Sequence, residues 1–114
     1  MSERLVVLST VGDAEAAEEI ARELVGKGLA ACVNIVPEIR SIYSWKGRIE
    51  TDTELLLVIK TTSERFEALR EALVARHPYE LPEVVALPIE AGHPPYLEWL
   101  EAACAKATGR TPVP

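Results

Sequence analysis

The residues of this sequence best suited to metal binding are its two histidines, His77 and His93. Neither belongs to an HxH, HxxxH or CxxC arrangement, the kind of spacing that places several ligands on one face. His77 precedes Pro78 at the expected C-terminal end of a helix, where a protonated imidazole also stabilises the helix dipole. Two interpretations of His77 stay open, a helix-capping residue and a metal ligand shared between neighbouring subunits.

A second group of candidates lies in the middle of the chain. Glu54 and Lys60 flank the apolar stretch 55–59 and are six residues apart, so they share one face of a regular strand. They either set the register of an interface or line a polar cleft between subunits. Tyr43 and Trp45 are alternate residues that point the same way, and large aromatic side chains are typical interface anchors. We predict that these four residues lie in a subunit interface or cleft.

Nothing in the sequence indicates a catalytic nucleophile. Cys32 lies within an apolar strand and Cys104 on the last expected helix, and we expect both to be free thiols that serve in packing. The sequence has no GxGxxG motif or P-loop. We therefore expect a protein that is not an enzyme and that holds no tightly bound cofactor.

Composition restricts the possible partners. The chain has 114 residues, of which 48% are hydrophobic, enough for one domain with a real core. A formal charge of −6 repels nucleic acid and anionic membranes, so divalent cations and protein surfaces are better candidates. The N-terminus lacks the layout of a signal peptide, and we expect a cytoplasmic protein.

Hydrophobic periodicity predicts two elements and then a long hairpin. A buried strand over 5–11 is followed by an amphipathic helix that begins after the N-cap Asp13 and ends at Gly26. Strand-forming residues then fill 29–45, with a break or bulge near Pro37. A tight reversal at Lys46-Gly47 leads into a second long strand, 48–60.

The remaining chain predicts a helix, a strand and a helix. Thr61 and Glu64 have the spacing of a capping box, and Pro78 ends this second helix after His77. Its expected buried stripe contains four apolar residues: Phe66, Leu69, Leu73 and Val74. A strand over 83–90 precedes a third helix that opens at Pro94.

This order predicts an α+β, ferredoxin-like βαββαβ sandwich with an extended hairpin between its second and third strands and a C-terminal helix. We expect a single domain over 1–108 and a flexible tail over 109–114. The helices would cover one face of the sheet. The other face and the distal hairpin, with Ile42 and Ile49, would be left bare, which favours an oligomer.

Four blocks of this sequence resemble the divalent-cation tolerance (CutA) family. They are Val33–Pro37 with Ser41–Gly47, Lys60–Thr62, His77–Glu83 and Tyr96–Leu100. The resemblance covers about 5–100 in order. It implies a homotrimer assembled through the long hairpins, similar to the PII signalling proteins, and a part in the response to divalent metal ions.

The resemblance also bears on metal ligands. Some family members are described as binding Cu(II) through histidine and cysteine side chains. Of those positions this sequence keeps His77, but it has Ser9 where a cysteine can occur and Arg76 where a second histidine can occur. A carboxylate such as Glu83 could complete a weak site. We expect weak binding of Cu(II) or another divalent cation. The alternative is a PII-like trimer that senses a small ligand or acts as a scaffold for an unknown protein partner.

Overall fold

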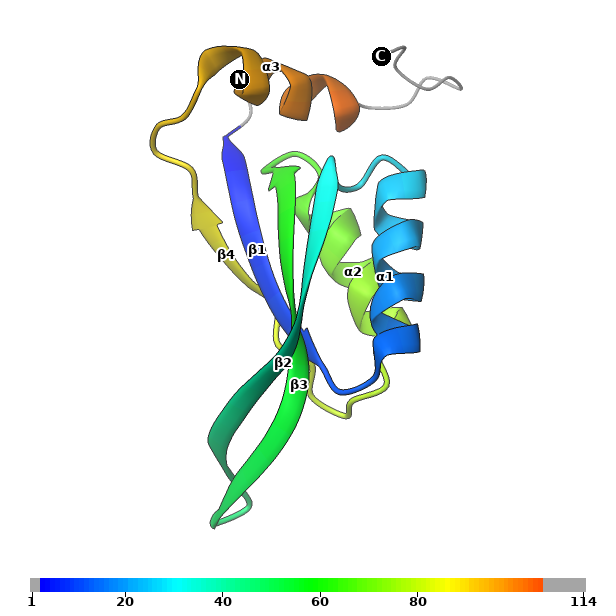
Figure 1. Ribbon diagram of the computed structural model, residues 1–114. Coiled ribbons are helices and arrows are strands. Elements are labelled where there is room, and N and C mark those ends of the chain that lie inside the picture. Colours follow the sequence, from blue (N-terminus) through cyan, green and yellow to red (C-terminus); the bar gives the residue numbers. More distant parts are fainter. Residues whose placement is uncertain (1–2, 106–114) are drawn as a thin grey trace.

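The computed structural model describes residues 3–105, which form four strands and three helices (Figure 1). In chain order these are β1 (Arg4–Val11), α1 (Ala14–Gly26), β2 (Cys32–Trp45), β3 (Arg48–Thr62), α2 (Phe66–Arg76), β4 (Val85–Pro88) and α3 (Pro94–Ala103). This order confirms the predicted α+β, ferredoxin-like fold with its C-terminal helix. The expected tail 109–114 lies outside the described residues.

The four strands form one antiparallel sheet in the order β2-β3-β1-β4. Helices α1 and α2 lie side by side against one face of this sheet, and α3 crosses one end of it (Figure 1). Asp13 caps α1 as predicted, with Oδ2 accepting from the Ala16 amide at 2.9 Å. Both long helices cover the same face, so no helix among residues 3–105 packs across the opposite face.

The hairpin of β2 and β3 is long, as predicted, with 14 and 15 residues in its arms against a usual strand of about five or six. Its ladder shifts register between Val36 and Ile39, where Glu38 has a φ of 63°. The predicted interruption near Pro37 is therefore present. Beyond it the two arms leave the helices behind and extend alone to the turn at Lys46-Gly47 (Figure 1).

Alternate strand residues build the main core. Val7, Leu57 and Ile59 have no exposed surface and pack against apolar residues of α1 and α2. These helical residues are Ala17, Ile20, Leu24, Leu69 and Leu73. A smaller cluster of Ala31, Leu100 and Cys104 joins α3 to the sheet. Both cysteines are free thiols, as expected.

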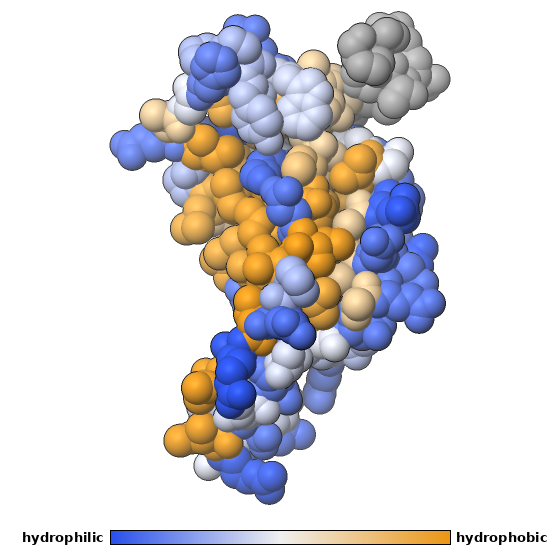
Figure 2. Space-filling view, in the orientation of Figure 1, coloured by the Kyte–Doolittle hydropathy of each residue, from blue (hydrophilic) through white to orange (hydrophobic). Residues whose placement is uncertain are grey.

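The other face of the sheet is also apolar. Side chains one residue out of step with the core point there, because successive residues of a strand alternate between faces. Val36, Val85 and Leu87 on this face are 41%, 46% and 48% exposed. Figure 2 shows a hydrophobic area over the sheet, interrupted by hydrophilic residues, beside the hydrophilic surface of α1.

Two expectations about element ends and one about a buried residue were wrong. Thr61 and Glu64 form no capping box, because β3 continues to Thr62 and the buried Thr61 hydroxyl donates to the Leu29 carbonyl at 2.6 Å. Val74 is 41% exposed and does not belong to the buried stripe of α2. The last strand is shorter than 83–90, since only Val85–Pro88 pairs with β1. No helix in the described part of the chain is long and apolar enough to cross a membrane.

Candidate functional site

A cleft of about 800 Å³ lies where the hairpin leaves the body of the protein. Its walls come from the end of β1, from the distal hairpin and from the loop after α2. We call it the hairpin cleft, and its lining residues are Thr10, Ser41, Ile42, Tyr43, Ser44, Trp45, Asp52, Glu54, Pro78, Tyr79, Glu80, Leu81 and Glu83. Tyr43, Trp45 and Glu54, three of the four residues predicted for an interface or cleft, are therefore in one wall.

Glu54 is the most buried residue of the hairpin cleft, and its partner is Tyr79. Glu54 is only 5% exposed, and its Oε2 accepts a hydrogen bond of 2.6 Å from the Tyr79 hydroxyl. Burial and this carboxylate raise the pKa of Tyr79 above its usual range. Gly12 makes room for the ring, because a Cβ there would stand 2.8 Å from the Tyr79 oxygen. The loop after α2 is thus fastened to β3 by one tyrosine.

The hairpin wall of the cleft holds a second tyrosine–carboxylate pair. The Tyr43 hydroxyl donates to Asp52 across the two arms, and this bond is the main reason that the pKa of Tyr43 rises to about 12. Trp45 follows on the same side, and Lys46 Nζ lies 5.6 Å from its ring centroid. This wall therefore combines aromatic faces with negative charge.

Among residues 3–105, the lining of the hairpin cleft has four carboxylates and no basic side chain. They belong to Asp52, Glu54, Glu80 and Glu83. Among the described residues, none of the four forms an ion pair with lysine, arginine or histidine. Their observed partners are neutral hydroxyl groups, including Thr10 Oγ1 at 3.4 Å from Glu83 Oε1. The cleft is strongly negative.

His77 lies beside the cleft and orients Tyr79. The Tyr79 amide N–H donates to His77 Nδ1 at 3.1 Å, so that nitrogen carries a lone pair. His77 Nε2 lies 2.7 Å from the Thr10 carbonyl and is the nitrogen that donates there. The imidazole is 7% exposed and meets the Tyr79 ring edge-on at 4.6 Å between centroids. Both ring nitrogens are engaged within the protomer.

These contacts do not fit a resident metal ion within one protomer. His77 and Glu83 both reach Thr10, but the imidazole has no spare lone pair while its two bonds persist. In the described part of the chain, no three His, Cys, Asp or Glu side chains are grouped closely enough to hold a metal. The two positions where family members can have further ligands provide none here. Ser9 is buried in the core, and Arg76 forms ion pairs with Glu23 and Glu19 of α1.

Lys60 is the predicted site residue that the structure does not bring to the cleft. It shares the helix-free face with Glu54, but it stands near the opposite end of β3, level with Cys32 of β2. Its ammonium group donates to the side chain of Asn34. Within one protomer the cleft therefore lacks the lysine that one of the two interpretations of the sequence placed beside Glu54.

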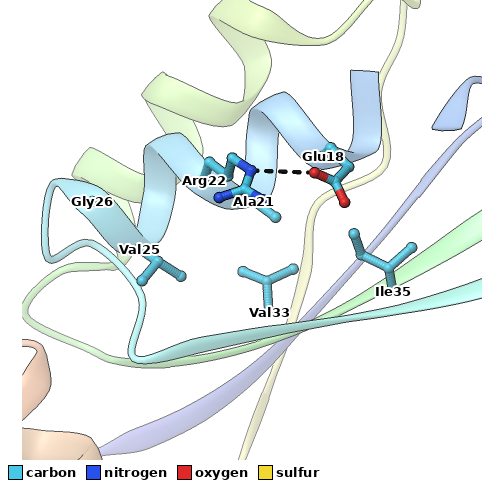
Figure 3. A pocket seen from close by; sticks show the side chains of 7 residues that line it. All are labelled: Glu18, Ala21, Arg22, Val25, Gly26, Val33 and Ile35. Carbon is cyan, nitrogen blue, oxygen red and sulfur yellow. Dashed lines mark hydrogen bonds and ion pairs between the residues drawn. The ribbon is translucent and has the colours of Figure 1, made fainter. Parts of the chain in front are cut away.

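A second, smaller hollow of about 400 Å³ lies between α1 and the edge strand β2. Ala21, Val25, Val33 and Ile35 form its apolar walls, and the Glu18–Arg22 ion pair, 3.2 Å long, crosses its rim (Figure 3). It contains none of the predicted site residues. We regard it as the open edge of the main core.

Sequence reasoning missed Asp52 and Tyr79 as members of the site. Tyr79 is 25 positions from its partner Glu54, and no local spacing connects them. For Asp52 a signal was available, because residues paired across a hairpin can be counted from its turn. Tyr43 is opposite Glu50 and Asp52 is opposite Ser41, so Tyr43 and Asp52 are diagonal neighbours on one face.

Comparison with known proteins agrees with this geometry. The model of the "CutA1 divalent ion tolerance protein" family matches residues 5–103. The chain belongs to this family. A "Divalent-cation tolerance protein CutA" from Thermus thermophilus is 55% identical over 95 residues, which are 83% of this chain and 92% of that protein. The crystal structure of CutA1 from Oryza sativa superimposes with a TM-score of 0.88 at 46% identity, covering 92% of this chain and 96% of the other.

Animal relatives are longer than this chain. The "Protein CutA homolog" of Xenopus laevis is 58% identical over 84 residues, which are 74% of this chain and 56% of that protein. The chain thus spans about half the length of the animal CutA proteins that it matches. The shared part contains the long hairpin and the His77 block.

Proposed function

We propose that this chain works as a homotrimeric divalent-cation tolerance protein that responds to metal ions and contacts Cu(II) or another divalent cation weakly. Membership of the CutA1 divalent ion tolerance family is the observation that carries this proposal. The acidic surface and the uncovered apolar face of the sheet support its two parts, cation contact and assembly.

The assembly part rests on apolar surface. Val36, Val85 and Leu87 lie on the helix-free face together with the half-buried Leu56 and Val58. Monomeric proteins seldom expose a contiguous apolar area of this kind, whereas subunit interfaces use such areas. Ile42 and Ile49 on the distal hairpin are also exposed, although they lie on the opposite face of its strands. Closed cyclic assembly would cover these surfaces without leaving a free edge.

Binding of a metal ion must be weak, because the hydrogen bonds of His77 oppose it. His77 can coordinate a cation only after one of its two hydrogen bonds is broken, and each such bond contributes roughly 1 kcal/mol. Glu83 is exposed and offers an oxygen ligand, which copper accepts less readily than imidazole. We therefore place any Cu(II) contact at His77 and Glu83, with remaining ligands from solvent or a neighbouring subunit.

Calorimetric titration of Cu(II) into metal-free protein tests this proposal, with His77→Ala as the variant and His93→Ala as its matched control. We expect saturable but weak binding that His77→Ala abolishes and His93→Ala leaves unchanged. Sedimentation of the same samples should give the mass of a trimer. Absence of saturable binding would overturn the metal part, and a monomer at micromolar concentration would overturn the assembly part.

A second candidate is a PII-like trimer that binds a small molecule or serves as a scaffold for another protein. The hairpin cleft favours it, since about 800 Å³ lies within the range of small-molecule sites, roughly 300 to 1,000 Å³. We propose no enzymatic activity, no tightly bound cofactor, and neither nucleic acid nor membrane as partner. A cytoplasmic location stays a prediction that fractionation of cells would check.

A further inference from the structure

The lining of the hairpin cleft determines which charge its ligand can carry. Four carboxylates face the cleft, and Lys60, which one interpretation of the sequence placed in a polar cleft with Glu54, lies elsewhere on the sheet. An anion such as a nucleotide or a dicarboxylate would be repelled by these carboxylates. Electrostatics alone therefore favours a positively charged ligand.

Glu54 gives this preference a specific location. Its side chain is almost fully buried, yet its observed partner is the neutral hydroxyl of Tyr79. A buried carboxylate is costly without a cationic partner, because neutral hydrogen bonds replace only part of its lost hydration. Among the described residues, none supplies that cation through an ion pair. A ligand that carries a cationic hydrogen-bond donor would supply the partner that the Glu54 carboxylate lacks.

The spread of the acidic groups argues against a metal ion as that cation. In the described residues no three acidic, histidine or cysteine side chains converge as a metal requires. Asp52 lies on the hairpin arm, whereas Glu80 and Glu83 follow α2, so the charges stand on opposite walls. An elongated organic cation can satisfy such separated carboxylates one at a time.

Aromatic side chains complete the wall. Tyr43, Trp45 and Tyr79 line the same cleft as the acids. Cations are attracted to aromatic faces, most strongly to tryptophan, and Lys46 already lies over the Trp45 ring. Alkyl segments between two charged groups would pack against these rings.

We propose that the hairpin cleft binds a small organic polycation, an alkylamine or alkylguanidine, with one charged end at Glu54 and another at Glu83 or Asp52. This inference rests on the second candidate function, that the cleft holds a small molecule, and it names the chemical class of that molecule. Tyr43 and Tyr79 stay protonated at physiological pH, because their raised pKa values keep both hydroxyl groups as donors to the carboxylates.

The test is calorimetric titration of spermidine into the full chain, in the presence of a chelator that removes metal ions. The variants are Glu54→Gln in the cleft and Glu98→Gln on α3, which change net charge equally. We expect saturable binding that Glu54→Gln weakens at least about tenfold, as loss of a charged hydrogen bond predicts. Glu98→Gln should leave the affinity within about twofold, because α3 lies at the opposite end of the sheet (Figure 1).

Glu83→Gln is a second cleft variant whose side chain is exposed, so it keeps the test valid if Glu54→Gln fails to fold. It should also weaken spermidine binding. Equal weakening by Glu98→Gln would overturn the proposal, since it would reveal attraction to net charge alone. So would absence of spermidine binding combined with loss of the oligomer in Glu54→Gln, which would assign Glu54 to a cation of a neighbouring copy.

Glutarate, an elongated dianion, serves as the matched probe of opposite charge. Binding of glutarate without spermidine would overturn the ligand class but leave a small-molecule site in place. If neither spermidine nor glutarate binds, both the polycation proposal and the small-molecule site are overturned. The copper titration and the sedimentation experiment give independent answers, so the metal-tolerance proposal stands or fails separately.

Discussion

The two faces of this sheet are built from alternate residues of the same strands and are both apolar, yet one is buried under helices and the other is exposed. On the helix side, Val7, Leu57 and Ile59 are sealed, and Ser9 is held among them without a hydrogen-bond partner in the described residues. On the other side, Val36, Val85 and Leu87 remain open. The first face forms the hydrophobic core of the protomer, and the second is available for contacts between subunits.

The buried polar groups differ between the two sides in the same way. Ser9 on the helix side is neutral and inert, whereas Glu54 beside the hairpin is charged and borders a cleft. A neutral hydroxyl left alone in a core costs little compared with a lone buried carboxylate. This contrast teaches that burial by itself does not mark a functional residue, while burial of a charge next to open space does.

Substitution of two adjacent leucines, one on each face, should give the largest effect that distinguishes the two faces. Leu57→Ala removes a fully buried side chain from the helix face and should lower the free energy of unfolding by about 3 kcal/mol. Leu56→Ala, on the opposite face, should act mainly on assembly, so its effect should depend on protein concentration. Guanidinium unfolding at two concentrations, together with sedimentation, measures both. Equal, concentration-independent losses would show that the two faces do not differ as described.

Alkaline pH sharpens the comparison at the cleft. The folded protein holds the Tyr79 proton more tightly than the unfolded chain, because burial and Glu54 raise the pKa of Tyr79. This contribution is fully present below the unfolded pKa of about 10 and is lost as pH rises through the higher folded pKa. We expect Tyr79→Phe to be less stable than the parent at pH 7 and to lose less stability above pH about 10.

Unfolding curves between neutral pH and pH about 11 would measure this difference. Tyr43→Phe is the matched control, because the pKa of Tyr43 also rises, to about 12, but its partner Asp52 is exposed. Solvent screening should make the effect of Tyr43→Phe smaller. Parallel pH curves for the parent and Tyr79→Phe would contradict the role assigned to the Glu54 contact.

Substitution of two buried hydroxyl groups on the helix face should give the smallest change in stability. Ser9 Oγ has no partner in the described part of the chain, so Ser9→Ala should be neutral or should stabilise by up to about 1 kcal/mol. Thr61→Val instead removes the bond to the Leu29 carbonyl and should destabilise by about 1 kcal/mol. Thermal unfolding of both variants checks the opposite signs, and destabilisation by Ser9→Ala would reveal a partner for its hydroxyl.

Most of the fold was predictable from local pattern. The apolar run 5–8 and the Asp13 cap located β1 and α1, and Lys46-Gly47 located the hairpin turn. The capping box at Thr61 was wrong because strand pairing with β1 extended β3 past the position where local chemistry would start a helix. Tertiary pairing here overrode a local signal worth about 1 kcal/mol.

The candidate site was predictable only in part. Tyr43, Trp45 and Glu54 were identified because they lie on one hairpin, whose geometry follows from its turn. Their meeting with Tyr79 and Glu83 depends on how the loop after α2 returns to the sheet, and that path is set by packing of α2 and by the two hydrogen bonds of His77. The sequence drew attention to His77 as a helix cap or a metal ligand, but the hydrogen bonds that engage both of its ring nitrogens could not be predicted from sequence.

By itself, then, the sequence determined the strand and helix order, the length of the hairpin and the apolar character of both sheet faces, because these depend on residue type and period. Only the tertiary structure decided that Lys60 lies far from the cleft, that Glu54 is buried beside a tyrosine, and that the cleft is negative. The physical reason is range. Period and turn chemistry act over a few residues, whereas the charge of a cleft is the sum of side chains brought together from distant parts of the chain.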